Sequence, residues 1–111
     1  MKQIQSNPLH RIFVAVIQGE KNRGLVIGTT TLFVEPKFIF TGGRVGHIED
    51  VAVRPEYQKQ GIGAKLVRYA TEQAASMGCV RTILDCSNEN VPFYKKIGYS
   101  LFGNCMKIQH E

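Results

Sequence analysis

An apolar strand, a glycine-containing turn and a helix follow one another between Ile48 and Leu66, and this order limits the possible folds more than any other feature. Gly61 and Gly63 stand in the turn, where residues without a Cβ let the backbone approach a ligand closely. The first turn of the following helix has unpaired N–H groups and the positive end of the helix dipole, which attract anions. The segment from Gln58 to Ala64 therefore predicts a cradle for a diphosphate group.

Short β-rich runs precede this unit. Residues 11–18 and 25–35 are rich in apolar and β-branched side chains, and the polar and glycine residues between them predict a β-hairpin. A break at Thr41-Gly42-Gly43 comes before a further strand over 45–53, which Arg54-Pro55 ends. The sequence thus predicts three antiparallel strands ahead of the helix.

Helical spacing of apolar residues begins after Gly61 and predicts a helix that stops at Gly78. The run over 80–86 predicts a buried strand, so strand, helix and strand form a βαβ crossover. The residues that define the helical spacing are Ile62, Leu66, Ala70, Ala74 and Met77.

A short helix and one or two strands are expected after the crossover. Asn90 is expected to cap the helix, with Pro92 in its first turn and an end at Gly98. Residues 99–102 and 104–109 are expected to form terminal strands, or one bent strand interrupted between them.

The charge of the chain favours a phosphorylated small molecule over a nucleic acid. The 111 residues carry a net charge of +5, and the pI is about 9.3. This balance suits an anionic partner. The basic residues are dispersed, with only Lys95 and Lys96 adjacent, and they form no stripe with aromatic residues on which bases would stack. Length and composition fit a single domain over 1–111.

Apolar runs and cysteines predict a cytoplasmic protein without a metal. Stretches such as 12–17 are far too short for a membrane span, and the first residues lack the pattern of a signal peptide. Cys79, Cys86 and Cys105 are odd in number and show no metal-ligand spacing with histidine. Reduced thiols are therefore expected, with no metal site.

From Pro8 to Ile108 the chain resembles the GNAT N-acetyltransferases, and within them the glucosamine 6-phosphate N-acetyltransferases. The resemblance implies an α/β (α+β) GNAT acyl-CoA N-acyltransferase fold, with a mixed, mostly antiparallel sheet and a βαβ core that binds the coenzyme. Its glycine loop matches the acetyl-CoA signature of the superfamily, and three further blocks match the branch. In order, the blocks are Lys37-Phe38-Ile39, Gly46-His47-Ile48-Glu49-Asp50, Gln58-x-x-Gly61-x-Gly63, and Ile83-Leu84-Asp85-Cys86 with Asn90 to Tyr99.

Two departures from this branch concern the acceptor site. Members begin with a further strand and two helices that line part of the sugar site, and this chain starts near their second strand. Their substrate-contacting arginine near the C-terminus corresponds to Gln109 here. The missing segment would leave the first strand as an open edge that a partner could cover. The branch forms its active site at a homodimer interface, so the resemblance implies a homodimer.

The resemblance also implies roles for individual residues. Asp85 would orient the amine or take its proton, the Val51 N–H would stabilise the oxyanion, and Tyr94 would protonate the thiolate. The phosphorylated amino sugar would contact Lys37, Glu49, Asp50, Val51, Arg81 and Asp85. Acetyl-CoA would contact Val51, Ala52, Val53, Gln58, Lys59, Gln60, Gly61, Ile62, Gly63, Ala64, Asn90 and Tyr94.

Each assignment has a structural alternative when the residue is considered alone. An aspartate at the end of an apolar strand, such as Asp85, is about as often a cap on the next loop as a base. A Phe-Tyr pair such as the one that contains Tyr94 is more often packing than catalysis. Lys37 and Arg81 would be solvated surface cations.

Other polar residues near the expected site are interpreted from their positions and from the resemblance. Glu49 and Asp50 alternate along the strand, so their side chains are expected on opposite faces. His47 shares a face with Glu49 and is expected to be structural. Cys86 has no histidine or helix start beside it in the sequence, which favours direct transfer in a ternary complex over an acyl-enzyme.

These patterns lead to one functional hypothesis and two alternatives. The main hypothesis is acetyl-CoA-dependent acetylation of the amine of glucosamine 6-phosphate, on the route to UDP-N-acetylglucosamine. The first alternative is acetylation of another amine, such as a polyamine, an aminoglycoside or a peptide. The second is a module that binds acetyl-CoA without catalysis.

Overall fold

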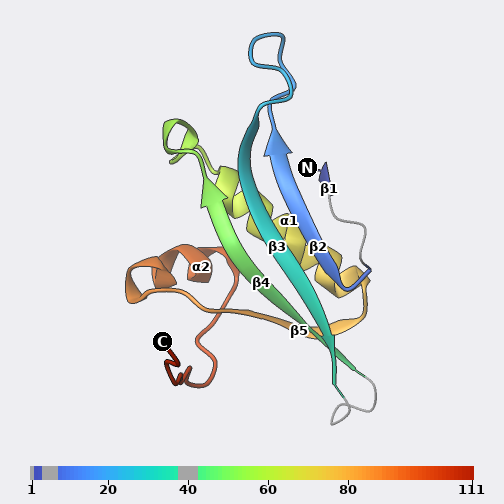
Figure 1. Cartoon of the computed structure of the whole chain (residues 1–111), viewed down its shortest axis with the longest axis vertical. Coiled ribbons are helices and arrows are strands. Elements are labelled where there is room, and N and C mark those ends of the chain that lie inside the picture. The colour runs from blue at the N-terminus through green and yellow to red at the C-terminus, as the bar shows by residue number, and fades with distance from the viewer. Residues whose placement is uncertain (1, 4–7, 38–42) are drawn as a thin grey trace.

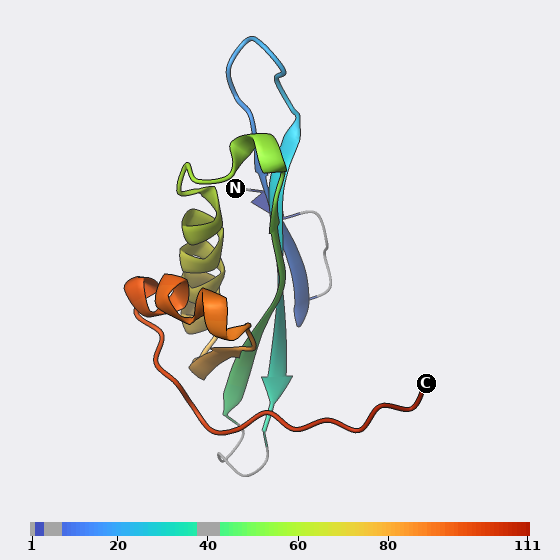
Figure 2. The ribbon, with the colours of Figure 1, turned by 90° about the vertical axis from the view of Figure 1, so that its left-hand side faces the viewer.

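A five-stranded sheet with two helices on one of its faces forms the body of the molecule (Figures 1 and 2). The computed structural model describes residues 2–3, 8–37 and 43–111. The two helices are α1 (Ile62–Ser76) and α2 (Val91–Ile97). The strands lie side by side in chain order: β1 (Lys2–Gln3), β2 (His10–Val16), β3 (Val26–Pro36), β4 (Arg44–Val53) and β5 (Cys79–Leu84).

The first four strands are antiparallel; β2, β3 and β4 are the three that were predicted, and β1 was not predicted. β2 pairs with β3 and β3 pairs with β4. β1 pairs with β2, with Lys2 opposite Val14 and Gln3 opposite Phe13. The edge of β2 was expected to be open, but β1 covers part of it. Part of the Lys37-Phe38-Ile39 block and of the break at 41–43 lies outside the described residues.

The predicted βαβ crossover is confirmed, and it contains much of the core. β4 and β5 are parallel, and α1 connects them. Leu32 and Ile48 in the strands pack with Val67 and Ala70 of α1, and these side chains are at most 3% exposed. A Cβ on Gly46 would lie 3.0 Å from the Cβ of a helix alanine, so glycine at this position lets α1 approach the sheet closely.

The expected ending of α1 is confirmed, and it orders the turn into β5. Gly78 has a φ of +84°, a left-handed conformation that favours glycine after a helix. The Gly78 N–H donates to the carbonyl of Ala75 at 3.1 Å. The guanidinium of Arg44 donates to the Met77 carbonyl at 3.2 Å, where the negative end of the helix dipole lies.

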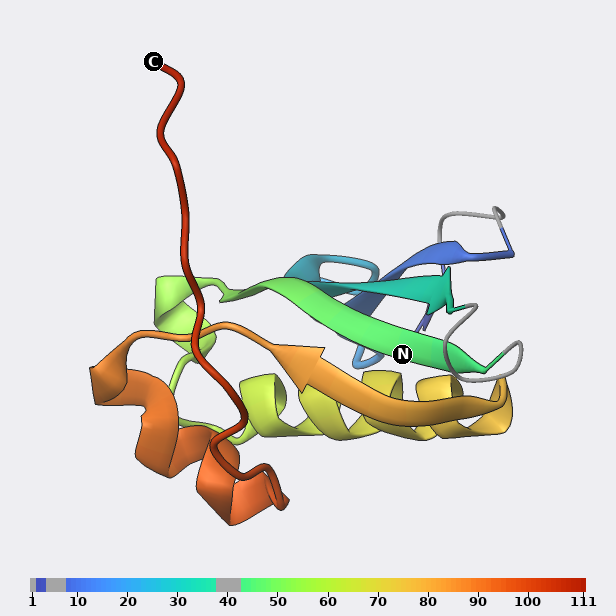
Figure 3. The same cartoon turned by 90° about the horizontal axis from the view of Figure 1, so that it is seen from below.

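The C-terminal part of the chain differs from the prediction. β5 is half-buried to exposed rather than buried, and Val80 is 58% exposed, because no described strand covers its outer edge. Residues 99–111 form neither a helix nor a strand, so the two predicted terminal strands are wrong. The segment crosses the end of β5 and runs away from the sheet (Figure 3). Strand-like alternation forms a strand only where a partner edge pairs with it.

Two further observations concern membranes and metals. Within the described residues, no helix is both long enough and apolar enough to cross a membrane. In the same part of the chain, no three His, Cys, Asp or Glu side chains are grouped so that they could hold a metal ion.

Candidate active site

A β-bulge interrupts β4 beside the end of β5. The register with β3 shifts opposite Thr30, so this residue faces both Asp50 and Val51. Asp50 has a φ of +56°, and the Thr30 hydroxyl donates to the Glu49 carbonyl at 3.2 Å. Pairing between β4 and β5 stops one residue before Glu49. The backbone over 49–53 therefore has no described strand on its β5 side, which leaves room for a ligand to bind there.

The bulge changes where two predicted substrate residues point. Glu49 and Asp50 were expected on opposite faces of the strand. Both are exposed, and both line the same cavity, because the positive φ of Asp50 breaks the alternation of side chains. The two carboxylates are thus brought together on one ligand-accessible surface.

The turn between β4 and α1 is held in an unusual backbone conformation. Residues Pro55–Tyr57 form a short 3-10 turn, η2, and the Gln58 side-chain amide donates to the Val53 carbonyl at 3.0 Å. Lys59 has a φ of +64°, and Gly61, the N-cap of α1, has a φ of +81°. The backbone conformation at position 61 therefore favours glycine.

Gly63 has a different reason to be glycine. A Cβ at this position would meet the Phe93 ring at 3.6 Å and Val53 at 3.7 Å, which are ordinary contacts. Packing within the chain does not demand glycine here. The first helical bond runs from the Lys65 N–H to the Gly61 carbonyl at 3.1 Å, so the N–H groups of residues 62–64 have no helical acceptor. This turn fits the diphosphate of a coenzyme.

A cavity of about 770 Å³ lies at the C-terminal ends of β4 and β5. Its walls come from these strands, α2 and the C-terminal segment, and it brings together predicted substrate and catalytic residues from three elements. The predicted site residues that line it are Glu49, Asp50, Asp85 and Tyr94. Those that do not are Lys37, Val51, Ala52, Val53, Arg81, Asn90 and the loop from Gln58 to Ala64.

Asp85 follows β5 directly, and its carboxylate is exposed at the cavity. The Cys105 thiol from the C-terminal segment lies 3.7 Å from Oδ2 of Asp85. Cys86 also lines the cavity, and both cysteines are free and exposed. The carboxylate is therefore accessible to a bound amine.

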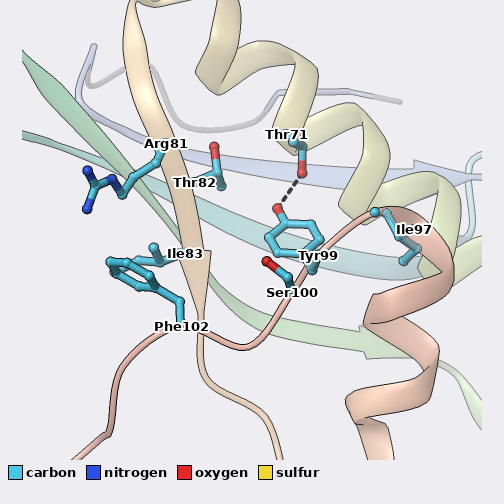
Figure 4. A pocket seen from close by; sticks show the side chains of 9 residues that line it. Thr71, Arg81, Thr82, Ile83, Ile97, Tyr99, Ser100 and Phe102 are labelled. Carbon is cyan, nitrogen blue, oxygen red and sulfur yellow. Dashed lines mark hydrogen bonds between the residues drawn. The ribbon is translucent and has the colours of Figure 1, made fainter.

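Tyr94 projects from α2 into the same cavity. Burial raises the pKa of its hydroxyl above the ordinary 10.0, and nearby Cys86 and Tyr99 add to the rise. The hydroxyl is consequently protonated near neutral pH and available as a proton donor. Its ring lies 6.2 Å from that of Tyr99, whose hydroxyl shares a 2.6 Å hydrogen bond with Thr71 of α1 (Figure 4).

Arg81 lies at a smaller cavity of about 380 Å³ beside the larger one (Figure 4). Its guanidinium stacks over the Phe102 ring, 5.2 Å from the ring centre. Both cavities share Thr82 and Tyr99 among their lining residues, so they adjoin along β5. Arg81 therefore faces the neighbouring cavity rather than the one that contains Asp85.

Asn90 stands at the N-cap of α2, but its side chain makes no capping hydrogen bond, and its backbone is already helical. The predicted cap position is therefore confirmed, but the side chain does not cap the helix. The neighbours Asn88 and Val91 line the larger cavity, whereas Asn90 does not. A contact of Asn90 with the coenzyme stays a prediction.

Glu35 makes an unpredicted link between two residues near the site. Its Oε2 lies 3.1 Å from the Lys37 ammonium, and its Oε1 lies 2.8 Å from Nε2 of His47. His47 also lines the larger cavity. These interactions lower the pKa of Glu35 below its ordinary 4.5, hydrogen bonding from His47 most and from Lys37 next. The alternation of Glu35 with apolar residues in β3 indicated its face but not its partners.

Comparisons with known proteins agree with this geometry. The model of the acetyltransferase (GNAT) family matches residues 1–99. The chain belongs to the GNAT acetyltransferase family. The glucosamine 6-phosphate N-acetyltransferase of Schizosaccharomyces pombe is 41% identical over 98 residues, which are 88% of each chain. The enzymes of that name from Trypanosoma brucei brucei and Candida albicans are 40% and 49% identical over 77% and 68% of this chain.

Solved structures confirm the GNAT fold. The glucosamine 6-phosphate N-acetyltransferase of Arabidopsis thaliana superposes with a TM-score of 0.84 and is 36% identical, over 93% of this chain and 68% of that one. A Trypanosoma brucei acetyltransferase gives a TM-score of 0.82 at 36% identity, over 91% and 69%. The matches to the trypanosome and Candida sequences span 58% and 51% of those relatives.

Proposed function

We propose that this GNAT chain transfers the acetyl group of acetyl-CoA to the amine of glucosamine 6-phosphate. The observation that carries the proposal is the cavity in which Asp85 and Tyr94 meet the acids of the β4 bulge. The relatives in fission yeast, Candida and the trypanosome are named for this reaction. A net charge of +5 suits two phosphorylated substrates.

The turn before α1 and the bulge of β4 would hold acetyl-CoA. The N–H groups of residues 62–64 would bind its diphosphate, and Gly63 leaves space for close approach. Gln58, Lys59 and Gln60 belong to the same turn. The backbone over 51–53 would receive the pantetheine arm, since no described strand pairs with it on the β5 side. Asn90 and Tyr94 would close the site from α2.

The reaction would proceed by direct transfer in a ternary complex. The neutral amine of the sugar attacks the thioester carbonyl, forming the C–N bond, and Asp85 accepts the proton that the nitrogen loses as the bond forms. The Val51 N–H stabilises the oxyanion. As the C–S bond breaks, Tyr94 protonates the departing thiolate.

The acceptor would be bound by the acids of the bulge and by nearby cations. Glu49 and Asp50 would accept hydrogen bonds from sugar hydroxyls, because both line the cavity with Asp85. Lys37 and Arg81 would pair with the phosphate.

A measurement of thiol release from acetyl-CoA tests this function. The wild-type chain is assayed with glucosamine 6-phosphate, with unphosphorylated glucosamine and without an acceptor. Turnover that depends on both the amine and the phosphate is expected. A preference for another amine contradicts the substrate, and silence with every acceptor while acetyl-CoA still binds indicates a binding module.

We also propose that the chain acts as a homodimer in which the C-terminal segment of one copy pairs along β5 of the other. β5 has no described strand on its outer edge, and the segment from Ser100 to Glu111 pairs with none of the described strands. Four of its apolar side chains are exposed: Leu101 by 76%, Phe102 by 67%, Met106 by 91% and Ile108 by 81%. Exposure of this kind in one short segment is typical of an interface.

Sedimentation of wild-type and substituted chains tests the dimer. The wild type should sediment as a dimer, and Ile108→Asp should shift it to a monomer, because a buried charge would replace an apolar contact. Gln109→Asp is the matched control, since it adds the same charge one residue away. A wild type that is active and strictly monomeric contradicts the proposal.

We place this activity in the cytoplasm, on the route to UDP-N-acetylglucosamine. The three cysteines are free thiols, and two of them are exposed, as is usual in a reducing compartment. Detection of the chain by fractionation with cytosolic markers is the expected result. Recovery in an oxidising compartment would contradict this location.

A further inference from the structure

One carboxylate, that of Glu35, connects two basic side chains near the candidate site. The Lys37 ammonium lies 3.1 Å from Oε2, and Nε2 of His47 lies 2.8 Å from Oε1. Each oxygen thus has its own partner. The side chains of Glu35, Lys37 and His47 are 36%, 34% and 26% exposed, so a ligand can still reach all three.

The position of this group is set by the sheet. Glu35 in β3 and His47 in β4 point to the face opposite α1, because Val34 and Ile48 next to them in sequence pack on the helix side. The ring of Phe33 lies 5.9 Å from the His47 ring and supports it from the neighbouring position of β3. His47 is therefore fixed at the wall of the larger cavity.

We propose that Glu35, held by His47, is a positioning residue that keeps the Lys37 ammonium preorganised as a donor for the phosphate of the sugar. This inference rests on the proposed function. It adds Glu35 to the residues that determine specificity for a phosphorylated acceptor.

The Lys37 ammonium keeps the capacity to bind a phosphate oxygen. An ammonium has three donors, and Glu35 occupies one of them at Lys37. Nε2 of His47 binds the other oxygen of the same carboxylate, and this contact fixes Glu35 beside the larger cavity. Without Glu35 the lysine side chain would be free to move. The entropy lost in ordering it would then weaken substrate binding.

Simple electrostatics predicts the opposite role for Glu35. A carboxylate near a phosphate repels it and competes for the same cations. If this repulsion were dominant, Glu35→Gln would strengthen binding of the phosphorylated substrate. If positioning is dominant, the same substitution weakens it. The sign of the change therefore separates the two roles.

The test compares Glu35→Gln with wild type in steady-state kinetics. We expect the KM for glucosamine 6-phosphate to rise about tenfold, the size of one lost hydrogen bond to a charged group. The kcat, the KM for acetyl-CoA and the KM for unphosphorylated glucosamine should stay within about twofold, because none of them involves the phosphate. Glu20→Gln, an exposed change in the β2–β3 turn, is the matched control and should leave all four values unchanged.

Several results would overturn the positioning role. A lower KM for glucosamine 6-phosphate would show that Glu35 only repels the phosphate, and an unchanged KM would show that it does not act on the phosphate. Equal losses with phosphorylated and unphosphorylated acceptors, together with a lower melting temperature, would indicate a purely structural residue. If wild type does not turn over glucosamine 6-phosphate, the proposed function fails and this inference fails with it.

Discussion

The two sides of the βαβ unit differ in how much of each side is built by a single chain. On the coenzyme side, α1 buries four residues against the sheet, and the turn before it is tied to β4 by the Gln58 side chain. On the acceptor side, neither β5 nor α2 contains a fully buried residue, and the chain beyond α2 has no regular structure. We therefore expect one chain to hold the diphosphate of the coenzyme, and a partner to complete the acceptor site.

The largest effect is expected from Asp85→Asn, which removes the proposed base from the acceptor side. We expect kcat to fall about 10³-fold, within the range for loss of a general base, while the Kd for acetyl-CoA stays unchanged. Thiol release and equilibrium binding measure the two quantities. Glu89→Gln, an exposed acid in the next turn, is the control. Full activity of Asp85→Asn would remove Asp85 from the chemistry.

Substitution of one leucine on each side tests how much that side contributes to the free energy of unfolding. Leu66 in α1 is 0% exposed, and a Cβ built on Gly28 would lie 2.9 Å from its side chain, so the site is tightly packed. Leu66→Ala should lower the free energy of unfolding by about 3 kcal/mol. Leu101→Ala, at 76% exposure, should change it by less than about 0.5 kcal/mol at concentrations where the chain is monomeric.

Urea unfolding followed by circular dichroism measures both variants. Similar losses at the two positions would contradict the comparison, because they would place Leu101 in the core of a single chain. A small loss for Leu66→Ala would contradict the tight packing of α1.

Two glycines separate backbone strain from ligand contact on the coenzyme side. Gly61→Ala should destabilise the chain by about 1 kcal/mol, because its φ of +81° is unfavourable for alanine. Gly63→Ala should leave stability unchanged, since its new Cβ meets only ordinary contacts, but should weaken acetyl-CoA binding about tenfold by occupying the space of the diphosphate. Thermal melting and titration calorimetry measure the two effects. Undiminished acetyl-CoA binding by Gly63→Ala would exclude the cradle.

The smallest expected effect is the pH dependence of stability at Glu35. Its pKa in the folded chain is below the ordinary 4.5, so the ionised carboxylate stabilises the fold above that pH. This contribution is lost as the pH falls through the lowered pKa. The difference in melting temperature between wild type and Glu35→Gln should therefore be constant above pH 4.5 and shrink below it. A difference that grows in acid would contradict the lowered pKa.

Sequence patterns were sufficient for the parts of the fold whose contacts lie within the βαβ unit. Apolar spacing identified α1, and Gly78 identified its end, because a helix stripe and a left-handed stop are local signals. The same patterns predicted the strand β5 but not its exposure, and they failed for the terminal strands expected over 99–102 and 104–109. Alternation shows that a segment can form a strand but does not show whether its partner lies in the same chain.

For the candidate site, the sequence predicted which residues meet but not how they are oriented. The resemblance named Glu49, Asp50, Asp85 and Tyr94, and the fold brings these four to one cavity. The orientation of Glu49 and Asp50 could not be predicted from the sequence. The bulge at Asp50 depends on pairing with β3, and it places both carboxylates on one surface. The bonds of Glu35 likewise depend on which residues two strands bring together.

We propose that one chain binds acetyl-CoA, whereas acetylation of glucosamine 6-phosphate needs a pair of chains. Acetyl-CoA affinity and thiol release per chain are measured over protein concentrations that span dissociation of the dimer. We expect a constant Kd for acetyl-CoA and a specific activity that rises with concentration to a plateau. Full specific activity at concentrations where sedimentation detects only monomers would contradict it.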